Sequence, residues 1–454
     1  QCQARATMIH SALARAAVRR VCNARRRDAL GFAHISALAS CRANATSATE
    51  TTKTDPEALS AEMVTYARRA WRSGDRATAA GVLEHGADLI TRAVEGQAAL
   101  ALAAHAAKAR TKLAWAAMQS DSGELAHAHR TTVEACASVD KSGHEFVSDA
   151  VVAHVAAAIN AARCHRSNAI STAPDPEGTF ATPWDVLALE DHLEDAASAA
   201  LLAECVGSHG KDLGDTETGP GLERCHSVSL DTKYKDVPQH ADAVALRIAM
   251  LGGRCAAASA LGDADAACDA ACDIHTQLEH NEWASEKGWT LVKQSTARGP
   301  HGAAVASALK FAAHWTTLRG AGCVGVDDDK YALASRTYDR ALAVAKTVAE
   351  STEHSAATAA LCADEIVADV CLAKAQLALR VAVAAFEDKR GDHDFDYLAL
   401  AETAAAAAVT AAESLGCPNG NHPRVGLAIA ASADVYVAKA VLAAKGKGGV
   451  GDGA

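Results

Sequence analysis

The stretch Ser73–Gly86 reads SGDRATAAGVLEHG and decides the fold, because its pattern returns along the chain. Gly74 permits a tight turn between two antiparallel helices. Asp75 then occupies the N-terminus of the second helix, where the helix dipole favours a negative charge. Small or apolar residues follow five, nine and twelve positions after the glycine and share one helical face: Ala79, Leu83 and Gly86. The stretch therefore predicts a helix hairpin with close packing between its helices.

The same spacing occurs three more times, twice with its glycine. Gly123-Glu124 is followed by Ala128, Thr132 and Ala135. Gly262-Asp263 is followed by Ala267, Ala271 and Ile274. Near Asp329 the glycine is missing, but the matching places hold Tyr331, Ala334, Tyr338 and Ala341. The chain is therefore expected to be a series of stacked hairpins.

The composition agrees with an all-α chain. Of its 454 residues 50% are hydrophobic but only 4% are aromatic, because alanine supplies most of the apolar mass. Alanine has the highest intrinsic helix propensity, and alternating runs typical of half-buried strands are absent. We expect helices over 57–72, 75–94, 97–119, 123–139, 145–166, 184–206, 239–261, 264–280, 282–297, 303–319, 329–351, 354–388, 395–415 and 423–444.

Five segments are expected along the chain. They are a basic segment at 1–49, N-terminal helical repeats at 50–206, a loop or linker at 207–238, C-terminal helical repeats at 239–444 and a flexible tail at 445–454. The first helix should begin with Asp55 as N-cap and Pro56 in its first position. The predicted fold is an α-solenoid of antiparallel helix pairs, in two halves.

The hairpin spacing resembles the tetratricopeptide repeat, in which helix pairs stack into a superhelix. The motif His422-Pro423-Arg424-Val425, followed by Ala428, Ala431 and Tyr436, resembles the opening of repeats of the kinesin-light-chain type. The resemblance covers about half the chain, in patches, and implies a surface that binds other proteins. It departs from the family in its period, since turns near 74, 123, 262 and 329 do not follow a regular step of about 34 residues. An irregular helical bundle is the alternative fold.

Charge divides the chain into two unequal parts. Eight arginines and one acid give residues 1–49 a net charge of +7, whereas the remainder carries −18. An arginine-rich, acid-poor segment rich in Ala and Ser is typical of an organelle transit peptide. We expect the protein to be located in mitochondria, in the matrix or on the matrix side of the inner membrane, with a plastid as the alternative. The other interpretation is a basic arm that the protein retains.

The acidic body disfavours nucleic acid as a partner, because it would repel phosphates. Fourteen cysteines without a Cys-x-x-Cys pair are more typical of a reducing compartment than of a disulfide scaffold. No stretch is convincing as a membrane span, although the protein could lie at the periphery of a membrane complex.

Several motifs resemble parts of binding or catalytic sites, but none of them predicts such a site. Gly320–Gly325 fits G-x-G-x-x-G but follows a predicted helix and precedes three acids, which a dinucleotide site would not tolerate. Cys268, Cys272 and His275 could share a helical face as metal ligands, but cysteine also packs as a small apolar residue. The remaining pairs are coincidences expected among twenty histidines: His127 and His129, Cys164-His165, Cys225-His226 and Asp392-His393-Asp394. We expect no catalytic, cofactor-binding or metal site.

The resulting hypothesis is a non-catalytic scaffold or accessory subunit of a mitochondrial multiprotein complex, of respiratory-chain or ATP-synthase type. Its partners would be protein subunits with basic or helical surfaces. The alternative is an adaptor or assembly factor that binds peptides, which predicts Lys, Arg or Asn along the inner groove. An enzyme would instead show a buried cluster of titratable residues in one cavity. An RNA-binding repeat protein is disfavoured by the charge.

Overall fold

The structure is a computed structural model. It describes residues 55–139, 141–142, 146–170, 238–280, 289–290, 294–296, 300–318, 328–350, 354–387, 397–415 and 423–448. Within these ranges the secondary structure is helical, with no strand. The expected segment at 1–49, most of the linker at 207–238, the helix at 184–206 and most of the helix at 282–297 lie outside the described residues.

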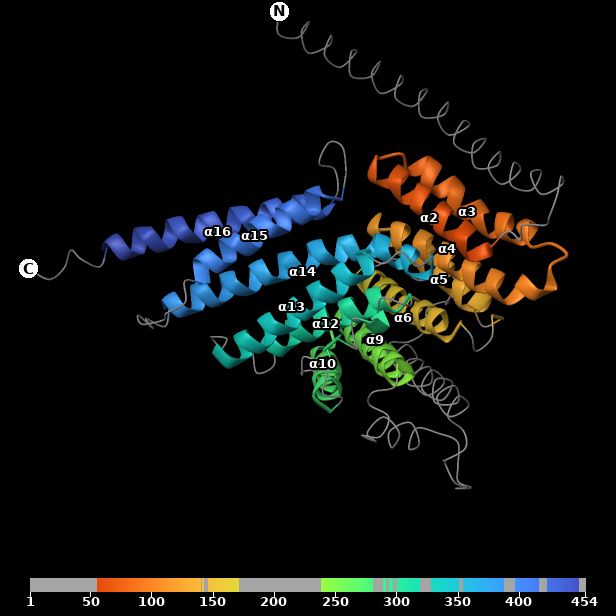
Figure 1. Cartoon of the computed structure of the whole chain (residues 1–454). Coiled ribbons are helices and arrows are strands. Elements are labelled where there is room, and N and C mark those ends of the chain that lie inside the picture. Colours follow the sequence, from red (N-terminus) through yellow and green to blue (C-terminus); the bar gives the residue numbers. More distant parts are fainter. Residues whose placement is uncertain are drawn as a thin grey trace, which may run out of the picture.

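Helices follow one another closely along the chain (Figure 1). In order they are α2 (Pro56–Arg72), α3 (Arg76–Ala93), a 3-10 turn η1 (Ala98–Leu100), α4 (Ala101–Asp121), α5 (Leu125–Val139), α6 (Val147–Ile170), α9 (Pro238–Leu261), α10 (Ala264–His280), α12 (Gly302–Leu318), α13 (Asp328–Glu350), α14 (His354–Glu387), α15 (Tyr397–Glu413) and α16 (Pro423–Gly448). These bounds confirm the predicted helices that lie in the described ranges. α16 continues beyond its predicted end at 444, into the expected tail.

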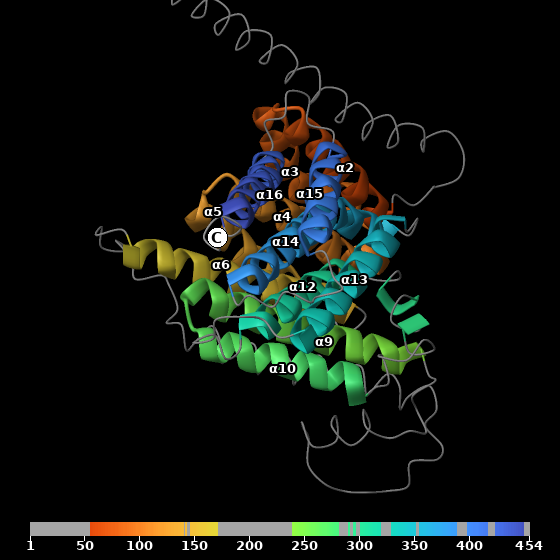
Figure 2. The same ribbon diagram turned by 90° about the vertical axis from the view of Figure 1, so that its left-hand side faces the viewer.

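The helices form two concentric series. An inner series runs α2, α4, α6, α9, α12, α14 and α16, and each member contacts the next. The outer helices α3, α5, α10, α13 and α15 each pack on the inner helix that precedes them. α14 also contacts α2, so the superhelix returns to its start and α14 crosses the middle of the view in Figure 2. The chain is therefore an α-solenoid whose inner helices surround a common centre.

The glycine–acid turns form as the sequence predicts. Gly74, Gly123 and Gly262 have φ angles of 84°, 80° and 84°, a conformation that favours glycine. Asp75 accepts a hydrogen bond from the backbone N–H of Thr78 at 3.2 Å. Asp263 accepts one from the N–H of Ala266 at 3.0 Å. Each turn thus ends an inner helix, and at Asp75 and Asp263 the acid also caps the outer helix that follows.

The small residues after each turn form the hairpin contact. They are buried in all four instances: Ala79, Leu83 and Gly86; Ala128, Thr132 and Ala135; Ala267, Ala271 and Ile274; Ala334, Tyr338 and Ala341. The N-terminal cap is also confirmed, because Asp55 accepts a hydrogen bond from the N–H of Glu57 and Pro56 begins α2. A continuous apolar core extends from α6 through α9, α10, α12 and α13 to α14.

One described helix is long and apolar enough to cross a membrane. The stretch Val244–Leu261 of α9 has a mean hydropathy of 1.4, but 72% of it is buried inside the protein. A buried core helix passes the same test of length and composition. α9 contacts α6, α10 and α12, as expected of a core helix.

Candidate binding site

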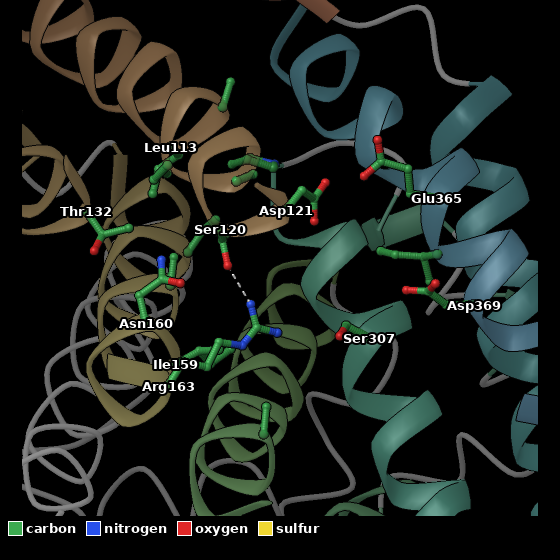
Figure 3. A pocket seen from close by; sticks show the side chains of 18 of the residues that line it. Leu113, Ser120, Asp121, Thr132, Ile159, Asn160, Arg163, Ser307, Glu365 and Asp369 are labelled. Atoms are coloured by element: carbon green, nitrogen blue, oxygen red, sulfur yellow. Dashed lines mark hydrogen bonds between the residues drawn. The ribbon is translucent and has the colours of Figure 1, made fainter. Parts of the chain in front are cut away.

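The inner helices enclose a cavity of about 350 Å³. Side chains from all seven described inner helices line it, so residues distant in the sequence meet there (Figure 3). Its walls carry both signs of charge. The charged lining residues are Arg68, Arg110, Asp121, Asp149, Arg163, Lys310, Glu365, Asp369 and Arg424. We call this space the inner cavity.

At one end of the inner cavity Arg110 of α4 is held by two carboxylates. Its Nε and Nη2 atoms donate to the two oxygens of Asp149 at 2.6 and 2.8 Å. Its Nη1 donates to Glu57 at 2.9 Å. Burial opposes the charge on Arg110, but hydrogen bonding to Asp149 and the nearby charges raise its pKa above the usual value. This group therefore joins α2, α4 and α6 through side-chain hydrogen bonds.

At the centre a second network joins the two ends of the chain. Arg68 of α2 donates to Glu365 of α14 at 2.7 Å, and both side chains are nearly inaccessible to solvent. Arg424 of α16 donates to both oxygens of Asp369, at 2.8 and 3.3 Å. The same guanidinium lies 3.6 Å from Glu365 and 3.7 Å from Asp121. The neighbouring carboxylates raise the pKa of Arg424 overall, although burial opposes its charge.

Two further cations face this central network with weaker partners. Arg163 of α6 donates to the hydroxyl of Ser120 at 2.9 Å, as the dashed line in Figure 3 shows. Lys310 of α12 lies 3.7 Å from Asp369, whose oxygens already accept from Arg424. Burial lowers the pKa of both groups. Asp121 opposes this effect at Arg163 and Asp369 opposes it at Lys310, whereas the charge of Arg424 adds to it at both.

The remaining lining of the inner cavity is mostly apolar, including Ile159, Phe311 and Ile366. A second hollow, of about 360 Å³, adjoins the inner cavity at Arg163. Arg163, Ala256 and Phe311 line both spaces. A charged group could therefore contact Arg163 from either side.

The motifs considered as sites in the sequence are not among the described residues that line the inner cavity. Cys268 and Cys272 are half-buried, and the Nε2 atom of His275 lies 2.8 Å from the Thr316 hydroxyl. No group of metal-binding side chains occurs among the described residues. Burial raises the pKa of the Cys164 thiol to about 11, which makes it unreactive at neutral pH. Gly320–Gly325, Cys225-His226 and Asp392-His393-Asp394 lie outside the described residues.

Sequence reasoning missed every charged residue of the inner cavity. Arg110, Arg163 and Lys310 lie in helical stretches that contain alanine, as exposed charges on amphipathic helices also do. The sequence offered only a weak indication that Arg110 is buried. Its near neighbours Ala106, Ala107 and Ala109 are all fully buried. A charge amid residues that pack so closely indicates a buried ion pair. Its partner, 39 residues away, could not be identified from sequence.

The outer surface of α16 is a second notable feature. Five large apolar side chains there are exposed to solvent: Leu427 (56%), Ile429 (55%), Tyr436 (59%), Val437 (62%) and Val441 (46%). Val425, Ala428, Ala431 and Val435 form the opposite, buried side. We call the exposed side the α16 face. The predicted His-Pro-x-Val motif does begin this helix, with Pro423 in its first turn.

No protein-family model matches the chain, and no curated protein matches it. Among solved structures it is similar to one described as "Circular tandem repeat protein with novel repeat topology and enhanced subunit contact surfaces". The two share 13% identity over 86% of this chain and 97% of that chain, with a TM-score of 0.24. That likeness is too weak to support an argument. The chain is a helical-repeat solenoid on the evidence of its own helix packing.

Proposed function

We propose that the chain is a non-catalytic scaffold subunit of a multiprotein complex, built on tetratricopeptide-like hairpins. The α16 face carries this proposal. Large exposed apolar patches on otherwise charged proteins mark interaction surfaces. Five such side chains on one helix are also what an amphipathic partner helix needs to bind.

The position of α16 in the stack supports this use. Each of α2, α4, α9, α12 and α14 is covered by the outer helix that follows it. Among the described residues no outer helix follows α16, so its face lies where the second helix of a hairpin would pack. A helix of another subunit could take that place. The expected partner is therefore an amphipathic helix that completes the last hairpin.

A substitution on the α16 face tests the proposal. Val437→Lys should separate the protein from its complex, because a lysine ammonium would be buried without a counter-charge at the interface. Val133→Lys on α5 is the matched control, since Val133 is also an exposed valine, at 50%. Migration on blue-native gels reports assembly. A wild-type protein that migrates as a monomer would refute the stable-subunit proposal, and so would equal behaviour of both variants.

We further propose a mitochondrial location, within a respiratory-chain or ATP-synthase type of complex. The support is the arginine-rich composition of residues 1–49 together with the acidic remainder. Fusing residues 1–49 to a fluorescent protein should direct it to mitochondria. A fusion that stays in the cytosol or enters plastids would contradict this location.

The peptide-binding adaptor gains specific support from the inner cavity. That hypothesis requires Lys, Arg or Asn on the inner surface, and Arg163, Lys310 and Asn160 line the cavity. A volume of about 350 Å³, however, lies at the small end of ligand sites and has no room for a helix. The adaptor is therefore the second candidate, limited to a peptide end or a small ligand.

The inner cavity also meets the condition set for an enzyme, a buried cluster of titratable groups. Three of its carboxylates, those of Asp149, Glu365 and Asp369, however, already accept hydrogen bonds from arginines and so serve to join helices. For this reason we keep the non-catalytic proposal. Turnover that disappears in an Asp121→Asn variant would favour the enzyme instead.

A further inference from the structure

Among the described residues that line the centre of the inner cavity, cations outnumber carboxylates. Arg68, Arg163, Lys310 and Arg424 face three carboxylates, those of Asp121, Glu365 and Asp369. The Arg110 network has an excess carboxylate, but Asp149 and Arg163 are 14 residues apart on α6, or about 21 Å along the helix. That carboxylate is therefore too distant to neutralise the centre. Among the described lining residues, the centre therefore holds one more cation than carboxylates.

Arg163 is the cation with the least compensation. Among the described residues its hydrogen-bond partner is a neutral hydroxyl, Ser120, and it forms no ion pair. Although burial lowers its pKa, part of the residue remains accessible to solvent, and it lines both the inner cavity and the second hollow, within reach of a bound molecule. Lys310 adds a second cation on the facing helix, because its partner Asp369 is shared with Arg424.

The second hollow offers an approach for an anion. Arg163 and Arg166 line it, together with Leu125, Ser259 and Phe311, and no carboxylate is among its described lining residues. Arg166 donates to the carbonyl of Ala260 at 3.2 Å, which holds that guanidinium at the rim. Two arginines without an opposing acid attract negative charge toward Arg163.

We propose that the inner cavity binds a small organic carboxylate whose single negative charge lies between Arg163 and Lys310 and whose apolar body contacts Ile159, Phe311 and Ile366. A planar guanidinium matches the two oxygens of a carboxylate. A single negative charge balances the surplus cation, whereas a phosphate dianion would face repulsion from Asp121 and Asp369. The proposal is independent of the α16 face and of the assembly it serves.

Calorimetric titration of the full chain at low salt tests this site. Hexanoate is the probe, with hexanamide as its neutral counterpart and hexyl phosphate as the dianion. Hexanoate should bind, while hexanamide should bind at least about tenfold more weakly, because it offers Arg163 no charge. Equal binding of hexanoate and hexanamide, tighter binding of hexyl phosphate, or no heat with hexanoate would each overturn the proposal.

Arg163→Gln should weaken hexanoate binding by about tenfold or more, since one charge-assisted contact is lost. Arg130→Gln is the control, because Arg130 is an exposed arginine of α5 outside both cavities. Circular dichroism and the unfolding temperature confirm that both variants fold. Unchanged hexanoate binding in a folded Arg163→Gln variant would refute the assignment.

A short peptide distinguishes the two sources of a carboxylate. If Gly-Gly-Leu with a free C-terminus displaces hexanoate and its C-terminal amide does not, a chain end also fits the site. If neither peptide competes, the ligand is a small acid. In both outcomes the carboxylate site stands, and displacement by the amide as effectively as by the free acid would contradict it.

Discussion

Arg110 shows how a single residue can hold three helices together in an alanine-rich chain. Alanine side chains leave little apolar area to bury, so specific polar contacts contribute a larger part of the packing than usual. The Arg110 guanidinium donates two parallel hydrogen bonds to the Asp149 carboxylate, and both side chains are almost fully buried. Such a network stabilises only while every member keeps its partner.

Asp149→Ala should therefore destabilise the fold by about 3–5 kcal/mol, because it leaves Arg110 buried with Glu57 alone. Glu134→Ala is the matched control. It removes the partner of Lys112 on the surface, where Glu134 is 62% exposed, and should cost less than about 1 kcal/mol. Urea denaturation measures both values. Equal losses in the two variants would show that the buried network is not essential.

His275 should make stability depend on pH. Burial lowers its pKa below the usual value, an effect that the nearby Glu279 only partly offsets. The unfolded chain therefore binds the proton more readily than the folded one. The stability that neutral His275 contributes is complete above about pH 6.5 and is lost as the pH falls. His275→Asn keeps a group that can bond Thr316 but cannot take up the proton.

The variant should consequently lose less stability than the wild type between about pH 7.5 and about pH 5. Urea denaturation at the two pH values gives the difference. Identical pH dependence of both proteins would show that His275 is not responsible. Because the comparison is between two proteins, titration of the other groups cancels.

At the scale of the helix, packing depends on close approach between helix backbones and not on large side chains. A Cβ atom added to Gly252 of α9 would lie 2.2 Å from the Cβ of Ala308 and 2.6 Å from its Cα. Backbone cannot move aside as a flexible side chain can, so Gly252→Ala should destabilise the protein by about 1–3 kcal/mol. Gly81→Ala on α3 meets nothing within 4 Å and should stabilise it by about 0.5–1 kcal/mol. Thermal unfolding of both variants should show these opposite signs.

The helices themselves were predictable because their signals are local. Gly74, Gly123 and Gly262 mark turns through their own backbone conformation. The spacing of the small residues that follow indicates which face of the helix packs on its neighbour. These local signals do not show how closely two helices approach. Gly252 and Gly81 are both glycines within a helix, yet only Gly252 lies against another helix.

At the scale of the whole molecule, contact between α2 and α14 closes the superhelix. Glu365 joins the two by accepting from Arg68 and lying 3.6 Å from Arg424. Glu365→Gln should cost about 3–5 kcal/mol, because the buried guanidinium of Arg68 and the half-buried one of Arg424 lose a counter-charge. Amide hydrogen exchange should rise in both α2 and α14, since the closing contact weakens.

Asp364→Asn provides the control at the neighbouring position. Asp364 lies 3.8 Å from Arg72, but its side chain is 45% exposed, so its loss should cost less than about 1 kcal/mol. Exchange in α2 and α14 should stay at the wild-type rate. If Glu365→Gln also left exchange unchanged, the closure would depend on apolar packing instead.

The amino-acid sequence by itself determined the helices, their turns and the faces by which hairpins pair, since propensity, capping and spacing act within about a dozen residues. Only the tertiary structure decided that the superhelix closes, which brings Arg68, Arg163, Glu365 and Arg424 around one cavity. Closure depends on the small rotation between successive hairpins, added over the whole stack. No local pattern encodes that sum, so partners nearly 300 residues apart, such as Arg68 and Glu365, become evident only in the folded molecule.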